Sequence, residues 1–186
     1  MTDIVDTLSL IQQLRDYEPS LVKKIFDFVF VPCSEDTEGK HKYIRAMSKH
    51  GTNTISINAF DENPALEMVI VDDSVETIGY CAFDNCSSLT HVTIGNSVKH
   101  IGNGAFNNCS SLTHVTISNS VETIGTGAFY KCSKLTQVTS PDSVKIIDYN
   151  TFYKCLSLEK VYIPKHLEEQ VKDNKVFPEK TEIIVH

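Results

Sequence analysis

The stretch VTIGNSVKHIGNGAFNNCSSLTH, residues 92–114, recurs along this chain of 186 residues at a period of 23. Four copies follow one another without an insertion between residues 69 and 163, so each position can be traced through the array. The most regular positions of this copy are apolar: Val98, Ile101, Phe106, Cys109 and Leu112. Residue types that return at a fixed spacing of 20–50 residues indicate stacked structural repeats.

A unit this short cannot bury its apolar side chains alone, so the copies must stack on one another as a solenoid. The alternation from Leu89 to Ile94 predicts a short strand that pairs in parallel with the same strand of the next unit. Residues 95–97 are turn formers, and Val98 to Ile101 returns on the opposite side. The spacing of Ala105, Phe106 and Cys109 fits a single helical or 3₁₀ turn. We expect units to lie ~4.8 Å apart, with the phenylalanine rings stacked in a ladder.

These positions resemble the BspA-type, or treponemal-type, leucine-rich repeat, whose unit reads Val-x-x-Ile-Gly-x-x-Ala-Phe-x-x-Cys-x-x-Leu-x-x-Val-x-Ile-Pro. The resemblance covers residues 53–164; the last proline is present only at Pro141 and Pro164, and Asp148 replaces the turn glycine. It implies an α/β, strand-rich, right-handed leucine-rich-repeat solenoid. For function it implies binding, since members include cell-surface adhesins that bind host matrix proteins and other cells.

Residues 1–50 do not fit the repeat and predict a helical N-terminal cap. Apolar spacing predicts helices over 4–14 and 21–29 and a third short helix over 40–49. Such helices would cover the open apolar end of the stack, which solenoids require, or would form a separate adaptor.

The repeats then occupy residues 51–163, and residues 164–186 predict a C-terminal cap made of a helix and a closing strand. The helix is expected over 164–177 and the strand over 181–185. Adding one period to Val161 reaches Ile184, so this tail is expected to form one more turn. The consecutive apolar residues 183–185 suit self-association through the edge of that strand.

Composition narrows the functional classes. A formal net charge of −7 argues against nucleic-acid binding, and no apolar run is long enough to span a membrane. The first residues lack the features of a secretory signal, so a cytoplasmic location is expected, with the cell surface by an unrecognised route as the alternative. No catalytic motif or phosphate-binding glycine loop is present. We therefore expect a non-catalytic protein without a cofactor.

Six cysteines invite a disulfide or metal interpretation. Four of them form a ladder at the repeat spacing: Cys86, Cys109, Cys132 and Cys155. Stacked side chains point the same way, which suits the dihedral angle of a disulfide poorly. We expect buried free thiols that pack as small apolar groups, as in a reducing compartment.

The candidate binding residues are the outward positions of the predicted strands. One row is His91, His114, Gln137 and Lys160, and the next is Thr93, Thr116, Thr139 and Tyr162. Two histidines are too few for a structural zinc site, so no metal is expected. The sequence predicts that a protein partner binds this concave strand face, with Tyr162 as an anchor. The alternatives are an adhesin for host matrix or other cells, and a structural module that assembles end to end.

Overall fold

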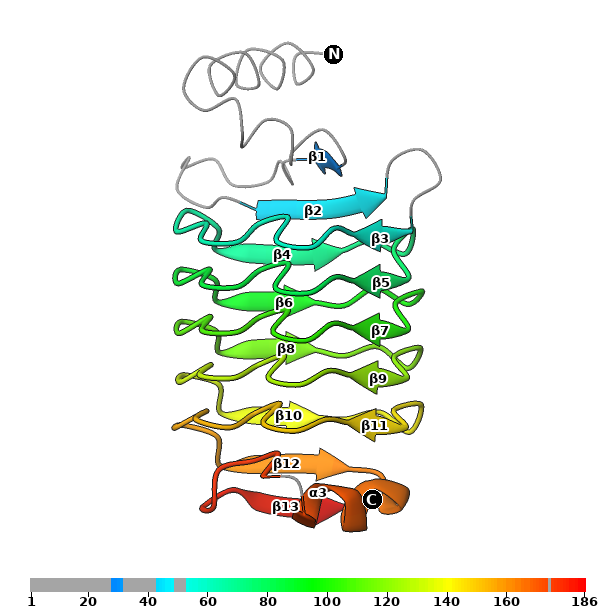
Figure 1. Cartoon of the computed structure of the whole chain (residues 1–186), viewed down its shortest axis with the longest axis vertical. Helices are drawn as coiled ribbons and strands as arrows, with labels where there is room; N and C mark the ends of the chain where they lie inside the picture. The colour runs from blue at the N-terminus through cyan, green and yellow to red at the C-terminus, as the bar shows by residue number, and fades with distance from the viewer. Residues whose placement is uncertain (1–27, 32–42, 49–52, 174) are drawn as a thin grey trace.

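The computed structural model describes residues 28–31, 43–48, 53–173 and 175–186. In this part of the chain each turn carries a longer strand on one side and a shorter strand on the other (Figure 1). The longer strands are β4 (Met68–Val71), β6 (His91–Thr93), β8 (His114–Thr116), β10 (Gln137–Thr139) and β12 (Lys160–Ile163). The shorter strands are β3 (Thr54–Ile55), β5 (Thr77–Ile78), β7 (His100–Ile101), β9 (Thr123–Ile124) and β11 (Ile146–Ile147).

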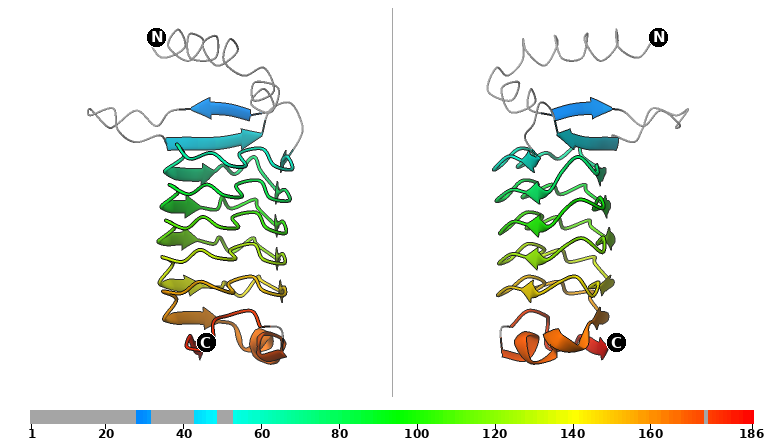
Figure 2. Two further views of the ribbon diagram at one scale, coloured as in Figure 1. Left: turned by 60° about the vertical axis from the view of Figure 1, so that its left-hand side comes forward. Right: turned by 90° about the vertical axis from the view of Figure 1, so that its right-hand side faces the viewer.

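Successive turns pair in parallel at the repeat spacing, as predicted. Met68 lies beside His91, and His91 beside His114, along the longer strands. The shorter strands form one continuous sheet in the order β11-β9-β7-β5-β3. The turns stack nearly straight in both views of Figure 2, so the surface of the longer strands is flat rather than deeply concave.

The longer strands begin earlier than the repeat spacing predicts. β2 (Tyr43–Ser48) pairs in parallel with β4, and β1 (Phe28–Val31) pairs antiparallel with β2. The third predicted helix, over 40–49, is therefore wrong for residues 43–48, and the second is wrong for residues 28 and 29. Without β2, the edge of β4 would have unpaired N–H and C=O groups, and residues 43–48 pair with them as a strand. The apolar spacing within residues 40–49 carries no information about this remote pairing. The rest of the predicted helical cap lies outside the described residues.

The C-terminal segment forms the expected extra turn, with changes. The predicted helix over 164–177 is shorter: a 3₁₀ turn, η1 (Lys165–Leu167), leads into α3 (Glu168–Asp173). The closing strand β13 (Glu182–Val185) pairs in parallel with β12, but Val161 lies beside Ile183 and not Ile184. α3 ends at Asp173, and Phe177, which directly precedes Pro178, lies outside the helix. Its ring stacks on Phe152 at 5.4 Å between centroids and ends the ladder.

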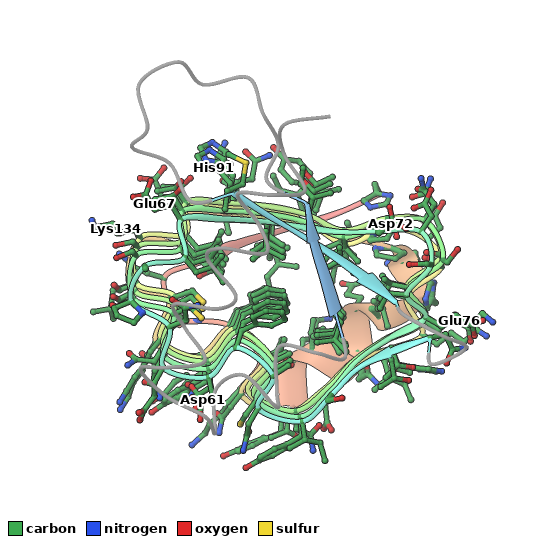
Figure 3. The ribbon with its side chains drawn as sticks, turned by 90° about the horizontal axis from the view of Figure 1, so that it is seen from above. Asp61, Glu67, Asp72, Glu76, His91 and Lys134 are labelled. Atoms are coloured by element: carbon green, nitrogen blue, oxygen red, sulfur yellow. The ribbon has the colours of Figure 1, made fainter. Side chains whose placement is uncertain are left out.

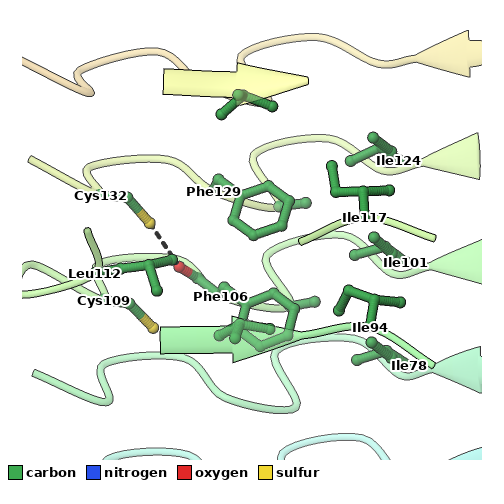
Figure 4. Close-up of a cluster of buried hydrophobic side chains, with 14 of the residues drawn as sticks. Ile78, Ile94, Ile101, Phe106, Cys109, Leu112, Ile117, Ile124, Phe129 and Cys132 are labelled. Atoms are coloured by element: carbon green, nitrogen blue, oxygen red, sulfur yellow. Dashed lines mark hydrogen bonds between the residues drawn. The ribbon is translucent and has the colours of Figure 1, made fainter. Parts of the chain in front are cut away.

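The core is a column of stacked side chains (Figure 4). The rings of Phe83 and Phe106 lie 5.0 Å apart, and those of Phe106 and Phe129 lie 5.2 Å apart, both nearly parallel. The backbone beside each ring also bonds between turns, since Phe106 N donates to Ala128 O at 2.7 Å. The predicted phenylalanine ladder is thus confirmed, and the turns are joined by rings as well as by strands.

The cysteine ladder has a second role beyond filling space. The four ladder cysteines are free and buried, as predicted. Each thiol donates to the carbonyl of a phenylalanine in the preceding turn; Cys132 Sγ, for example, lies 3.2 Å from Phe106 O (Figure 4). The same contact recurs at Cys86, Cys109 and Cys155. A small apolar side chain with a weak donor therefore fits this position in every turn.

Two glycines of the 92–114 copy serve different purposes. A Cβ at Gly102 would lie 2.7 Å from Ile78 O of the preceding turn, so close stacking of backbones excludes a side chain there. Gly104 instead adopts a φ of +64°, which L side chains rarely adopt. Gly102 thus allows the backbones of successive turns to approach, while Gly104 allows a left-handed backbone conformation.

Candidate functional site

The strand face consists of the outward side chains of β6, β8, β10 and β12, the eight residues predicted above. Along β6 the exposed His91 and Thr93 flank the buried Val92, so alternation places them outward. Figure 3 shows His91 on this side of the stack and Asp61 on the opposite side. The hydrogen-bonded register sets each residue of β6 beside its equivalent on β8.

The two histidines of the strand face form a stacked pair. Their ring centroids lie 4.8 Å apart with an interplanar angle of 4°. The hydroxyl of Thr90 donates its only proton to Glu67 O at 2.9 Å, so it must accept a proton from Nδ1 of His91. Likewise, the hydroxyl of Thr113 donates to Thr90 O and accepts a proton from Nδ1 of His114. The neutral rings are therefore Nδ1–H tautomers, which leaves Nε2 of each as an acceptor.

On β10 and β12, the other half of the strand face, two of the four candidate side chains already have contacts within the protein. Gln137 and Thr139 are exposed on β10. On β12, Lys160 forms an ion pair with Glu182 at 3.6 Å. Tyr162 is half-buried beside Thr139 and Ile184 in the register of the sheet. The predicted anchor therefore presents less of its ring than an isolated tyrosine would.

The strand face is divided by a seam between β8 and β10. The two strands belong to different sheets, one ordered β1-β2-β4-β6-β8 and the other β10-β12-β13. The gap between them is visibly wider than the neighbouring gaps in Figure 1. Structure therefore separates His91, Thr93, His114 and Thr116 from Gln137, Thr139, Lys160 and Tyr162.

The seam coincides with one change in the repeat. Ser140 occupies the inward position that Val71, Ile94, Ile117 and Ile163 occupy in the other turns. Its side chain is smaller, and Val115 and Ile117 beside it are less covered than their equivalents, Ile117 being 9% exposed. Ser140 was visible in the sequence as a departure from this pattern, but periodicity alone does not say that the sheet divides there.

The buried hydroxyl of Ser140 also lacks a partner. The residue is 1% exposed, and no hydrogen bond reaches its Oγ within the described part of the chain. The other buried hydroxyls are satisfied: Ser118 donates to Gly95 O and Thr151 to Asp148 O. An unpaired buried hydroxyl is costly, and Ser140 is the exception among the buried hydroxyl groups of the described residues.

Three of the four ladder thiols are poor nucleophiles. Burial raises the pKa of the Cys86 thiol to about 12, and burial likewise raises the pKa of Cys109 and Cys132. Thiols that stay protonated at neutral pH react slowly. Across residues 53–173 and 175–186 and the two N-terminal strands, no group of three or more His, Cys, Asp or Glu side chains is arranged to hold a metal ion. No helix in the same residues is long and apolar enough to cross a membrane.

Solved structures share this architecture. A leucine-rich repeat protein of Treponema pallidum is 26% identical, with a TM-score of 0.64, over 75% of this chain and 70% of that one. A leucine-rich cell surface protein of Faecalibacterium prausnitzii is 26% identical, with a TM-score of 0.57, over 86% of this chain and 49% of that one. A Bacteroides ovatus leucine-rich repeat protein is 28% identical, with a TM-score of 0.52, over 76% of this chain and 44% of that one. This chain thus spans less than half the length of the last two.

The family comparison agrees with these likenesses. No curated protein matches the sequence. The sequence model described as the BspA type leucine rich repeat region matches six copies over residues 53–183, which is well over half of the chain. With its stacked turns, phenylalanine ladder and cysteine ladder, this chain belongs to the BspA-type leucine-rich repeat family.

Proposed function

We propose that this chain is a non-catalytic module that binds a protein partner through the strand face. The observation that carries the proposal is the register of β6 and β8, which holds exposed side chains in fixed rows on a rigid sheet. A surface that is already ordered loses less conformational entropy when a partner binds. Membership of a leucine-rich repeat family supports a binding role.

The stacked histidines indicate what such a partner presents. Their Nδ1–H groups are bound to Thr90 and Thr113, and their rings are exposed. Nε2 of His91 and Nε2 of His114 therefore accept hydrogen bonds from donors on the partner, such as hydroxyl or amide groups. Thr93 and Thr116 lie next to them in the second row and add hydroxyl groups of either polarity.

Affinity capture with mapped variants tests this proposal. The full chain is immobilised, and proteins retained from the native lysate are compared with a panel of matrix proteins. The His91→Ala/His114→Ala double variant and Tyr162→Ala are each expected to weaken the captured partner with little change in melting temperature. Lys131→Ala, in a turn away from the strand face, is the control and should bind normally. If Lys131→Ala abolishes binding while the strand-face variants do not, the strand face is not the binding surface.

A surface adhesin is the second candidate. It is favoured by the likeness to the cell surface protein of F. prausnitzii. For the protein-binding module we propose the cytoplasm instead, where the free thiols of the cysteine ladder would stay reduced. Labelling of intact cells with a membrane-impermeant reagent separates the two, since only a surface protein is labelled before lysis.

Self-association is the third candidate, and the edge strand β13 favours it. Within the described residues β13 pairs only with β12, and Ile183 is 39% exposed. Such an edge can pair with a strand of another molecule. Sedimentation at increasing concentration should show association that Ile183→Lys removes; a monomer at all concentrations would eliminate this candidate.

A further inference from the structure

The seam between β8 and β10 opens as a cleft of about 650 Å³ on the strand face. Hydroxyl and amide side chains make up much of its lining, among them Thr113, Asn119, Thr136, Gln137 and Thr139. The volume falls within the ~300–1,000 Å³ typical of small-ligand sites. This cleft exists at one seam because only there does a serine replace the inward valine or isoleucine.

The walls of the cleft carry unpaired backbone groups. At the closed seam between β6 and β8, Thr113 N donates to Thr90 O at 2.9 Å and Ile94 N donates to Thr116 O at 2.9 Å. Among the described residues the equivalent bonds, from Thr136 N to Thr113 O and from Ile117 N to Thr139 O, do not form. The cleft therefore holds two N–H donors and two carbonyl acceptors that have no partner in the described protein and that water or a ligand must satisfy.

The width of the seam limits the size of the group that can bridge the backbones of β8 and β10. The Cα atoms of β8 and β10 still approach within 8 Å. A single hydroxyl oxygen that bridges N–H and C=O widens a sheet from ~4.8 Å to ~7 Å, whereas an inserted strand needs ~9.6 Å. A hydroxyl also donates and accepts through one atom, which matches one unpaired donor and one unpaired acceptor.

The charges of the cleft select a neutral ligand. Its lining contains no lysine or arginine, and its ionisable groups are His114, Asp142 and His186. His186 faces Asp142, with Nδ1 and Oδ1 3.8 Å apart. Without a lysine or arginine an anion finds no strong partner, and one carboxylate beside a histidine is a weak cation site. A ligand with several neutral hydroxyl groups fits both the side chains and the backbone.

We propose that this cleft binds a neutral carbohydrate, whose hydroxyl groups bridge the unpaired backbone groups of β8 and β10. The carbohydrate is preferred to the serine or threonine of a protein because one side-chain hydroxyl fills little of the cleft and meets few of its polar groups. Carbohydrate binding here does not depend on the protein-binding role proposed for the whole face.

The test is a titration of the ¹⁵N-labelled chain with lactose, maltose, cellobiose and N-acetylglucosamine, followed by two-dimensional NMR. Saturable shifts of the amides of Ile117 and Thr136 are expected with at least one sugar. Thr139→Val, which removes a lining hydroxyl, should weaken binding about tenfold. Thr77→Val, the same change on β5 in the sheet of shorter strands, is the matched control and should leave the affinity unchanged.

Closing the seam provides the second variant. Ser140→Ile restores the residue type of the other turns, so it should raise the melting temperature and abolish the sugar-induced shifts. The capped amino acid N-acetylthreonine methylamide tests a protein source of the hydroxyl. Shifts with this compound and none with the sugars, or no shifts with any probe, would overturn the carbohydrate site. Because no partner protein is present, neither outcome bears on the protein-binding proposal.

Discussion

Truncation of one ring in the phenylalanine ladder tests the stacking that holds the turns together. Phe106 is fully buried and stacks on Phe83 at 5.0 Å and on Phe129 at 5.2 Å. Phe106→Ala removes a buried ring and both aromatic contacts, and the adjacent rings cannot close the gap because each is held by its own turn. We expect a loss of about 3–5 kcal/mol in the free energy of unfolding, in the range of buried phenylalanine truncations.

Urea unfolding followed by circular dichroism measures this loss. With a slope of ~2–3 kcal/mol per molar urea, the midpoint should fall by about 1–2.5 M. Leu156→Ala is the control, because Leu156 is 64% exposed and its removal should change stability by less than about 0.5 kcal/mol. A Phe106→Ala midpoint equal to that of Leu156→Ala would show that ring stacking does not stabilise the solenoid.

Two further predictions concern the thiols and the seam. The folded chain keeps Cys86 protonated to about pH 12, while the unfolded thiol ionises near its ordinary pKa of 9.0. Stability should therefore fall as pH rises above 9, by about 1.4 kcal/mol per thiol per pH unit, and melting temperatures of Cys86→Ala should show a shallower decline. The amides of Ile117 and Thr136 should exchange hydrogen at least about tenfold faster than those of Ile94 and Thr113, which are bonded across the closed seam. Equal exchange rates would mean that the seam is closed in solution.

The repeat was sufficient to predict the stacked turns, because side chains that recur at a fixed spacing must occupy equivalent environments. Phe106 and Cys109 recur with their neighbours and form the expected ladders. Alternation along residues 91–93 correctly placed His91 and Thr93 outward and Val92 inward. These features depend on the nearest turns alone, and those turns have nearly the same sequence.

The ends of the stack depended on contacts that are remote in the sequence. Residues 43–48 carry an apolar pattern that fits a short helix as well as a strand. They form a strand because they pair with β4. Phe177 was expected to end a helix, but its ring stacks on the Phe152 ring as the last member of the ladder. A terminal turn has one neighbour in place of two, so the repeat spacing constrains it less.

The sequence alone thus determined which residues face outward on the strands, and tertiary structure decided which of them lie together. The eight candidate residues were expected to form one continuous surface, yet the seam at Ser140 divides them into two groups of four. The physical reason is that a strand's alternation is local, whereas the distance between two strands depends on how the side chains beneath them fill the core. The smaller, polar side chain of Ser140 at the inward position is enough to separate β8 from β10, the two strands that lie over it.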